Sequence, residues 1–370
     1  MRSEAMPVGR GGRGLYERYA RFMPQELLGG AVDLGQGFTP LVSSRSIGPK
    51  AGIPNLYFKL ESLNPSGSYK DRFAGLAVGH AAAAGRFVAT SSGNTGAALA
   101  AFSAAVGCRC ALFVSENAPA GKLAQMAAYG ADVFRVKHYT IDAAESARVS
   151  ETIERAAKAR GLEIFTTAYA KSPLPMEGIK TIAYELFEDL GEIGEVFVPA
   201  GGGGLYVATC RGFDDLLAEG DLATLPRMHI VQPTGNDTMA TPLREGAREA
   251  RHVSTSTSIS GLGVSRVLDG HIAIEHARRS GGTGHVVGED RIREVQARLA
   301  REEGILVEPA GATSVAGLLD AAVRGELGTG PVVCLLTGHG FKDPATVDAM
   351  STARPPRLID RSQIEASLDV

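Results

Sequence analysis

The sequence lacks a basic charge excess, cysteine pairs and long apolar runs, and each absence excludes a class of protein. Lys and Arg number 38 against 41 Asp and Glu, so the net charge of −3 offers no basic field for nucleic acid or an anionic membrane. The four cysteines form no CxxC pair and have no metal-like spacing with histidine, and no HExxH motif occurs. This favours free core thiols in a reducing cytoplasm and no metal site.

Membrane insertion and secretion are also disfavoured. The most apolar run, residues 96–106, is rich in alanine and far too short to cross a bilayer. The N-terminus has arginines but no apolar segment, so we expect no signal peptide and a cytoplasmic location. With 370 residues and 44% hydrophobic side chains, the chain is typical of a globular protein of roughly two domains.

From Arg86 onward, short apolar runs alternate with helical patterns. We expect strands at 87–90, 110–115, 132–136, 163–167, 195–200, 228–233 and 331–338, and helices at 94–107, 120–130, 141–161, 290–304 and 311–322. This alternation predicts an α/β fold whose mostly parallel sheets are covered by helices on both faces. The ends, residues 1–13 and those after Ala353, are expected to form an arm and a loose extension.

Four adjacent glycines, in "PAGGGGLYVA" (199–208), follow a predicted strand and precede a predicted helix. Consecutive glycines carry a high entropic cost in a packed element. They are favoured where backbone N–H groups must wrap an anion in front of a helix N-terminus. The alternative is a flexible loop, but the strand before and the helix after argue against it. No Gly-Lys-Ser/Thr follows, so this is not a Walker A loop.

Two further strand ends carry polar groups. In "TSSGNTGAALA" (90–100), five small or hydrogen-bonding residues open a helix, although a routine N-cap needs only one. This pattern is typical of a carboxylate site. In "LLTGHGFKD" (335–343), a buried strand leads to Thr337, whose hydroxyl suits a heterocyclic nitrogen or an ordinary turn. Parallel sheets bind ligands at these carboxyl ends.

Lys70 lies in "ESLNPSGSYKDRFAG" (61–75), after small residues that let the backbone approach a ligand. Most lysines are solvated surface charges. Here three further features occur together: a glycine run suited to a phosphate (201–204), a loop suited to a carboxylate (91–95) and a hydroxyl at a strand end (Thr337). Together they can hold a phosphorylated heterocycle that bears an aldehyde. The amine of Lys70 would then form a Schiff base with it.

The chain resembles the fold type II pyridoxal phosphate (PLP) enzymes, the tryptophan synthase β superfamily, and within it the threonine synthase branch. The resemblance is carried, in the family's order, by "LNPSGSYKDR", "SSGNTGAALA", "VPAGGGGL", "EPAGATSVAGL" and "LLTGHGFKD", and by "ERYARFMP" with "DLGQGFTPLV" near the start. It implies two three-layer α/β/α domains with pyridoxal 5′-phosphate in the cleft between them. The predicted domains are 1–62 with 169–370, and an inserted smaller domain, 63–168. It also implies a homodimer.

The resemblance also implies residue roles. Lys70 would bind the cofactor covalently and then act as base at the substrate α-carbon. The cofactor phosphate would be held by Gly201, Gly202, Gly203, Gly204 and the Leu205 amide. Asn94 would meet the ring 3′-oxygen and Thr337 the pyridine nitrogen. The substrate carboxylate would be held by Ser91, Ser92 and Thr95. Arg72 is a candidate for a substrate phosphate, or else for an ion pair with a neighbour.

The implied reaction is elimination or replacement on an O-activated amino acid, with O-phosphohomoserine to threonine as its example. A neutral hydroxyl at Thr337 favours this chemistry over transamination. However, "GGGGL" resembles the serine/threonine dehydratases and "SISGLGVSRVLDG" (258–270) the cysteine synthase branch. Serine, O-phosphoserine and O-acetylserine therefore stay open as substrates. Two other hypotheses are weaker. The intact Lys70 and loops argue against a non-catalytic PLP-binding protein, and a nucleotide-binding protein leaves Lys70 and the Asn94 loop unexplained.

Overall fold

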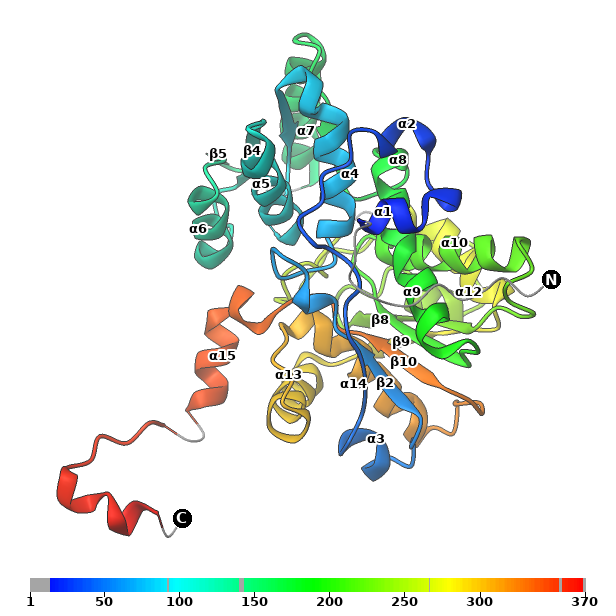
Figure 1. Ribbon diagram of the computed structural model, residues 1–370, viewed down its shortest axis with the longest axis vertical. Coiled ribbons are helices and arrows are strands. Elements are labelled where there is room, and N and C mark those ends of the chain that lie inside the picture. Colours follow the sequence, from blue (N-terminus) through cyan, green and yellow to red (C-terminus); the bar gives the residue numbers. More distant parts are fainter. Residues whose placement is uncertain (1–13, 92, 140–142, 266, 353–354, 369–370) are drawn as a thin grey trace.

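The computed structural model describes residues 14–91, 93–139, 143–265, 267–352 and 355–368. These residues form two β-sheets, one of six strands and one of four. Figure 1 shows helices α4 to α7 gathered around the smaller sheet in the upper half of the molecule, and the larger sheet with its helices below. The predicted α/β class is therefore confirmed.

The large sheet joins strands from both ends of the chain. Its order is β1 (Leu41–Ser43), β2 (Leu56–Lys59), β10 (Val332–Leu335), β7 (Glu195–Pro199), β8 (Arg227–Pro233) and β9 (Gly284–Val287). Strand β10 pairs in parallel with both β2 and β7, and among the described pairs only β1 and β2 run antiparallel. The sheet is therefore closed by segments that lie far apart in sequence.

Side chains of the large sheet alternate between two apolar cores. Val196 and Val198 of β7 belong to one core with helices α9 (Thr181–Leu190), α10 (Gly204–Ala218) and α12 (Gly270–Arg279). Phe197, between them, belongs to the other core with α13 (Glu289–Arg298) and α14 (Pro309–Val323). This period of two buries both faces of the sheet, as expected for a parallel α/β layer.

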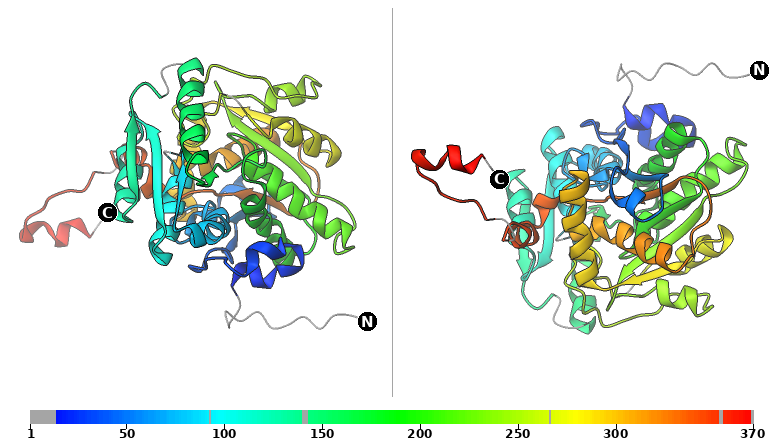
Figure 2. Two further views of the ribbon diagram at one scale, coloured as in Figure 1. Left: turned by 90° about the horizontal axis from the view of Figure 1, so that it is seen from above. Right: turned by 90° about the horizontal axis from the view of Figure 1, so that it is seen from below.

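The small sheet is parallel throughout, with the order β5 (Asp132–Val136), β4 (Arg109–Ser115), β3 (Arg86–Ala89) and β6 (Ile164–Phe165). Val88 packs with helix α7 (Ala143–Lys158) on one face, and Phe87 and Ala89 pack with α4 (Asp71–Ala81) and α5 (Asn94–Val106) on the other. The left view of Figure 2 looks onto this layer from above. Helix α6 (Ala120–Ala128) follows β4.

All four strands of the small sheet lie between residues 86 and 165, within the segment predicted to be inserted. The large sheet takes strands from both sides of that segment. The proposed division at residues 63 and 168 remains a prediction, because helix α4 contacts α5 as well as α8 (Pro173–Met176).

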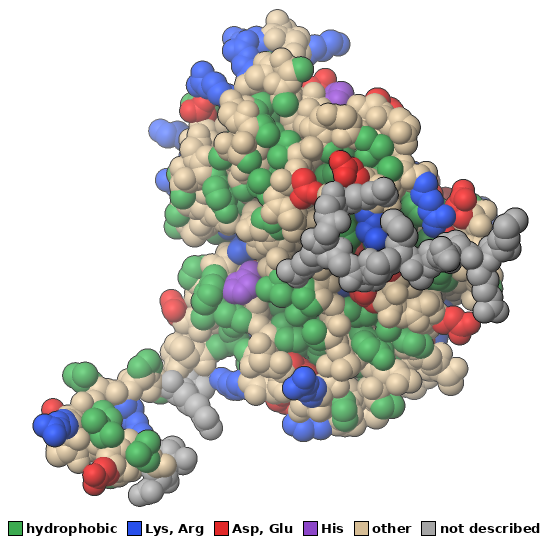
Figure 3. Space-filling model, viewed as in Figure 1, with side chains coloured by type: hydrophobic (Ala, Val, Ile, Leu, Met, Phe, Trp, Pro, Cys, Tyr) green, Lys and Arg blue, Asp and Glu red, His purple; other side chains and the backbone are tan. Residues whose placement is uncertain are grey.

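Shorter elements complete the described chain. They are α1 (Leu15–Arg18), α2 (Gln25–Leu28), α3 (Ile47–Lys50), α11 (Ala240–Arg244) and α15 (Pro344–Ser351). The C-terminal segment, residues 355–368, extends away from the two sheets and their helices and is visible at the lower left of Figures 1 and 3. None of the described helices is long and apolar enough to span a membrane.

Three differences from the predicted elements have local causes. Strands β1, β2 and β9 were not predicted, because they are only three or four residues long and each contains a polar side chain. The run at 163–167 keeps only a two-residue strand, and Thr166 and Thr167 leave the sheet. The helix predicted over 290–304 changes at Leu299 into a π-helical turn that ends at Gly304.

Candidate active site

Lys70 stands at the N-cap of α4, beside the end of β10. The Tyr69 N–H donates to the Thr337 carbonyl at 3.1 Å, and Ser68 forms an antiparallel bridge with Gly338. Gly67 has a φ of 87°, a conformation that favours glycine. The small residues before Lys70 therefore let this loop lie directly against the strand end that carries Thr337.

The amine of Lys70 is suited to act as a base or nucleophile. Its Nζ donates to Thr167 Oγ1 at 2.7 Å. Burial lowers the pKa of Lys70 from 10.5 to about 7, although the Glu308 carboxylate acts in the opposite direction. A lysine with this pKa is neutral for much of the time near neutral pH, which an ordinary surface lysine is not.

The loop after β3 brings the predicted carboxylate-binding residues to the same place. Helix α5 begins at Asn94, and Ser91 Oγ accepts from the Gly93 N–H at 3.3 Å. Thr95 Oγ1 lies 3.2 Å from Thr167 Oγ1, so Thr95 connects through one hydroxyl to Lys70. Ser92, the remaining predicted residue of this set, lies outside the described residues.

The glycine run lies between β7 and α10, as predicted. A Cβ on Gly201 would lie 2.5 Å from the Gly261 carbonyl, one on Gly204 would lie 2.8 Å from the Thr167 carbonyl, and Gly203 has a φ of 90°. These three positions therefore require glycine. Among the described residues, the nearest atom to a Cβ at Gly202 would be Val264 Cγ1 at 3.8 Å, an ordinary van der Waals contact, so that position is not crowded. Leu205 is buried in the first turn of α10.

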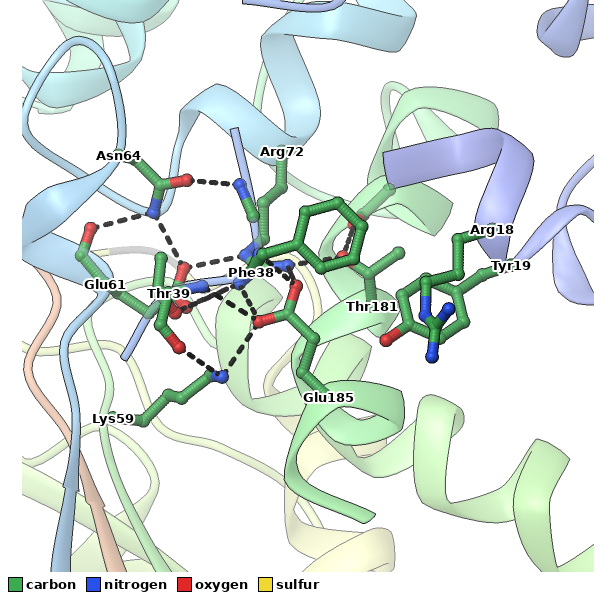
Figure 4. Close-up of polar contacts among 12 residues, drawn as sticks. Arg18, Tyr19, Phe38, Thr39, Lys59, Glu61, Asn64, Arg72, Thr181 and Glu185 are labelled. Atoms are coloured by element: carbon green, nitrogen blue, oxygen red, sulfur yellow. Dashed lines mark hydrogen bonds and ion pairs between the residues drawn. The ribbon is translucent and has the colours of Figure 1, made fainter. Parts of the chain in front are cut away.

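Arg72 is not brought to the predicted substrate site. It is fully buried between Glu61 and Glu185, which it bonds at 2.7 Å and 2.6 Å, and it also donates to Thr181. Figure 4 shows both carboxylates directed at its guanidinium, with the Lys59 amine joined to the Glu185 carboxylate from below. Burial alone would raise the pKa of Glu185, but the charges of Arg72 and Lys59 lower it to about 2.

This arrangement corrects the candidate role of Arg72 as a phosphate ligand. All five guanidinium N–H groups have protein acceptors, because Nε and the two terminal nitrogens bond Glu61, Glu185 and Thr181. The alternative expectation, an ion pair with a neighbour, describes the structure, although the partners differ from the adjacent Asp71. We therefore leave Arg72 out of the substrate contacts.

A buried charged cluster that the sequence reasoning missed adjoins the site. Glu308, the N-cap of α14, accepts from Asn94 Nδ2 at 2.6 Å and pairs with Lys122 of α6 at 3.3 Å. Lys122 also donates to Ser260 Oγ at 2.8 Å. The sequence signals that could have pointed to these residues were the motif "EPAGATSVAGL", which begins with Glu308, and the run "STSTSIS", which ends with Ser260. Thr167 was not singled out as a site residue, because it is the last residue of a predicted strand (163–167) and no motif surrounds it.

The residues present fit pyridoxal phosphate. Asn94 Oδ1 is buried and accepts no hydrogen bond from any described residue, which leaves an acceptor for a ligand. Gly202 adjoins the N-terminus of α10, where backbone N–H groups suit a phosphate. Lys70 supplies a free amine of lowered pKa. The cofactor phosphate thus has the N-terminus of α10, the ring has Asn94, and the aldehyde has the amine of Lys70.

Comparison with known proteins gives the same assignment. The family model described as "Pyridoxal-phosphate dependent enzyme" matches residues 32–338. The chain belongs to this family. It is a PLP-dependent lyase of fold type II, and its substrate is a small amino acid.

Two relatives are named threonine synthase. The chain is 34% identical to "Threonine synthase" of Methanocaldococcus jannaschii, with 88% of this chain and 80% of the relative covered. It is also 34% identical to "Threonine synthase" of Halalkalibacterium halodurans, with 92% of each covered.

Solved structures confirm the fold. Maize serine racemase matches with a TM-score of 0.69 and 23% identity over 85% of this chain and 92% of that one. Threonine deaminase isoform 2 of Solanum lycopersicum matches with a TM-score of 0.67 and 20% identity over 90% and 82%. At these identities the likeness concerns the fold alone.

Proposed function

We propose that this chain converts an O-activated amino acid by elimination and replacement, with O-phospho-L-homoserine to threonine and phosphate as the reaction. The observation that carries the proposal is the Lys70 amine, which has a pKa lowered to about 7 and lies within hydrogen-bond distance of Thr167. Two relatives named threonine synthase, each 34% identical over most of the chain, support the choice of substrate.

In this proposal the glycine run and the Leu205 amide bind the cofactor phosphate. Asn94 orients the ring at its 3′-oxygen, and Thr337 meets the ring nitrogen. When bound, the cofactor supplies an electron sink for the carbanion at the substrate α-carbon. Lys70 removes the proton that creates this carbanion, and a neutral amine is the form required for that step.

The substrate carboxylate is assigned to the loop before α5. Ser91 and Thr95 supply hydroxyls there, Ser92 is assigned the same role from the sequence, and the first turn of α5 adds backbone N–H groups and the positive end of the helix dipole. The proposal places the α-carbon between this loop and Lys70. Support comes from the connection of Thr95 to Lys70 through Thr167, which puts the two halves of the site within one hydroxyl of each other.

A second candidate is β-replacement or β-elimination on serine, O-phosphoserine or O-acetylserine. It is favoured by one observation: Arg72, the arginine that could have received a γ-phosphate, is fully used by Glu61 and Glu185. Lys122, a buried cation that adjoins the site, pairs with Glu308. Serine and O-acetylserine carry no phosphate and would need no cation there, so the observation favours these two substrates over O-phosphoserine.

A substrate panel tests the proposal. The purified chain, supplied with pyridoxal phosphate, is assayed with O-phospho-L-homoserine, O-phospho-L-serine, O-acetyl-L-serine and L-serine, and threonine, phosphate and keto acids are quantified. We expect the highest kcat/KM and stoichiometric threonine with O-phospho-L-homoserine. A higher kcat/KM with any serine derivative would replace the first candidate by the second.

The homodimer and the cytoplasmic location stay predictions. Mass measurement in solution tests the first, and cell fractionation tests the second.

A further inference from the structure

Thr167 is the hydroxyl that meets the reactive amine, although no motif marked it. It follows β6 and accepts a hydrogen bond from Lys70 Nζ at 2.7 Å. Its Oγ1 also lies 3.2 Å from Thr95 Oγ1, where either hydroxyl can be the donor. A hydroxyl both donates and accepts. The pair can therefore accept from a charged Lys70 or donate to a neutral one without losing the contact.

The backbone around Thr167 is held from several sides. Asp269, fully buried, accepts from the N–H groups of Tyr169 at 2.8 Å and Ala170 at 3.2 Å. Ser172 Oγ accepts from the Thr166 N–H at 3.1 Å. The Thr167 carbonyl presses against the glycine run, where Gly204 leaves room for it. The hydroxyl is thus presented to Lys70 by a fixed turn between the small sheet and the phosphate loop.

We propose that Thr167 is a positioning residue that stabilises Lys70 in its free-amine state. This inference rests on the proposed function. When the amine of an amino acid replaces Lys70 on the cofactor carbon, one C=N bond breaks and another forms, and two hydrogens pass from the incoming nitrogen to Lys70. The freed amine then needs a partner, because a buried amine without a hydrogen bond is costly. Thr167 is that partner, and it keeps Lys70 near the α-carbon.

The inference predicts two effects of opposite sign for Thr167→Val, which removes the hydroxyl and keeps the shape. Without its partner the free amine is less stable, so the cofactor-free chain should bind pyridoxal phosphate about fivefold more tightly. For the same reason, an amino acid should displace Lys70 about fivefold less readily. Cofactor affinity is measured by equilibrium titration, and displacement by the change in visible absorbance on adding L-alanine, which carries no leaving group.

Matched variants separate this role from simple damage. Thr167→Ser keeps the hydroxyl and should restore both constants to the parent values. Thr166→Val makes the same chemical change one residue earlier and should alter neither. If Thr167→Val does not fold, Thr167→Ala carries the same expectation. The affinity for pyridoxal phosphate is sufficient to separate the inference from damage to the site. Damage would lower this affinity, whereas the inference requires that Thr167→Val raise it.

The outcomes are distinguishable from failure of the proposed function. Equal cofactor affinity in parent and Thr167→Val, or weaker affinity in the variant, overturns the inference while the proposed function stands. An equal effect of Thr166→Val also overturns it. A parent chain that never joins pyridoxal phosphate to Lys70 overturns the proposed function, and this inference with it.

Discussion

At the scale of single residues, the chemistry depends on the surroundings of one amine. Lys70 is partly buried, burial lowers its pKa to about 7, and Glu308 limits that shift. Its sequence position, after small residues, indicated a close approach to a ligand. Its contact with Thr167 could not be predicted, because the two residues are 97 positions apart and no local pattern joins them.

Lys70→Ala should abolish turnover while the chain stays folded. The expected loss in kcat is about 1,000-fold or more, because both the covalent attachment and the base are removed. The fold should persist, since a desolvated amine contributes little to stability. Turnover of the preferred substrate and thermal unfolding followed by circular dichroism check this. Lys158→Ala, an exposed lysine on α7, should behave like the parent. Retained activity in Lys70→Ala would refute the catalytic assignment.

The rate of covalent cofactor uptake should depend on pH through Lys70. Only the neutral amine attacks, and the pKa of Lys70 in the folded chain is about 7. The rate constant should therefore rise between about pH 6 and about pH 8 and then level off. Stopped-flow absorbance of the cofactor-free chain mixed with pyridoxal phosphate measures it. A rate that still climbs steeply above about pH 9 would mean that Lys70 has the pKa of an ordinary lysine.

At the scale of elements, strand ends and helix starts build the site. Strands β3, β7 and β10 were predicted from their apolar runs, and each leads into a predicted loop. The glycine run was recognisable because its cause is local: three of the four positions are too crowded or too strained for a side chain. Glu308 was missed because its site partners, Asn94 and Lys122, come from distant segments.

Gly202→Val should fold but lose cofactor. The nearest described atom would lie 3.8 Å from a Cβ there, so a side chain can be accommodated, yet it would cover the backbone N–H groups of the glycine run that we propose to hold the phosphate. We expect at least about a tenfold weaker affinity for pyridoxal phosphate, measured by titration after cofactor removal. Gly288→Val serves as control, because Gly288 stands at the remote N-cap of α13 and no described atom lies within 4 Å of a Cβ placed there. Undiminished cofactor occupancy in Gly202→Val would count against the glycine run as the phosphate site.

Arg72→Ala should destabilise the chain by about 3–5 kcal/mol, because it leaves Glu61 buried without its cation and Glu185 with Lys59 as its remaining buried cation. Urea unfolding measures this. The exposed pair of Arg109 and Asp132 provides the comparison, and Arg109→Ala should cost less than about 1 kcal/mol. If both variants lost a similar amount of unfolding free energy, the buried ion pairs of Arg72 would stabilise the chain no more than an exposed pair does.

At the scale of the whole molecule, the candidate site joins loops that follow strands of both sheets. Helix α6 of the small unit reaches the large unit through Lys122 to Glu308 and through Gln125 to Lys342. The sequence predicted two α/β units but not these contacts, since each joins residues more than a hundred positions apart. It left Arg72 open between a substrate phosphate and an ion pair, because its position two residues after Lys70 does not reveal that its side chain points into the core.

Reductive trapping of the holoprotein tests the central claim most directly. The purified chain is loaded with pyridoxal phosphate, treated with borohydride, digested and sequenced by mass spectrometry. We predict a single cofactor-derived mass on Lys70 and none on Lys122 or Lys342. Absence of the adduct from Lys70, or its presence on another lysine, would contradict the account.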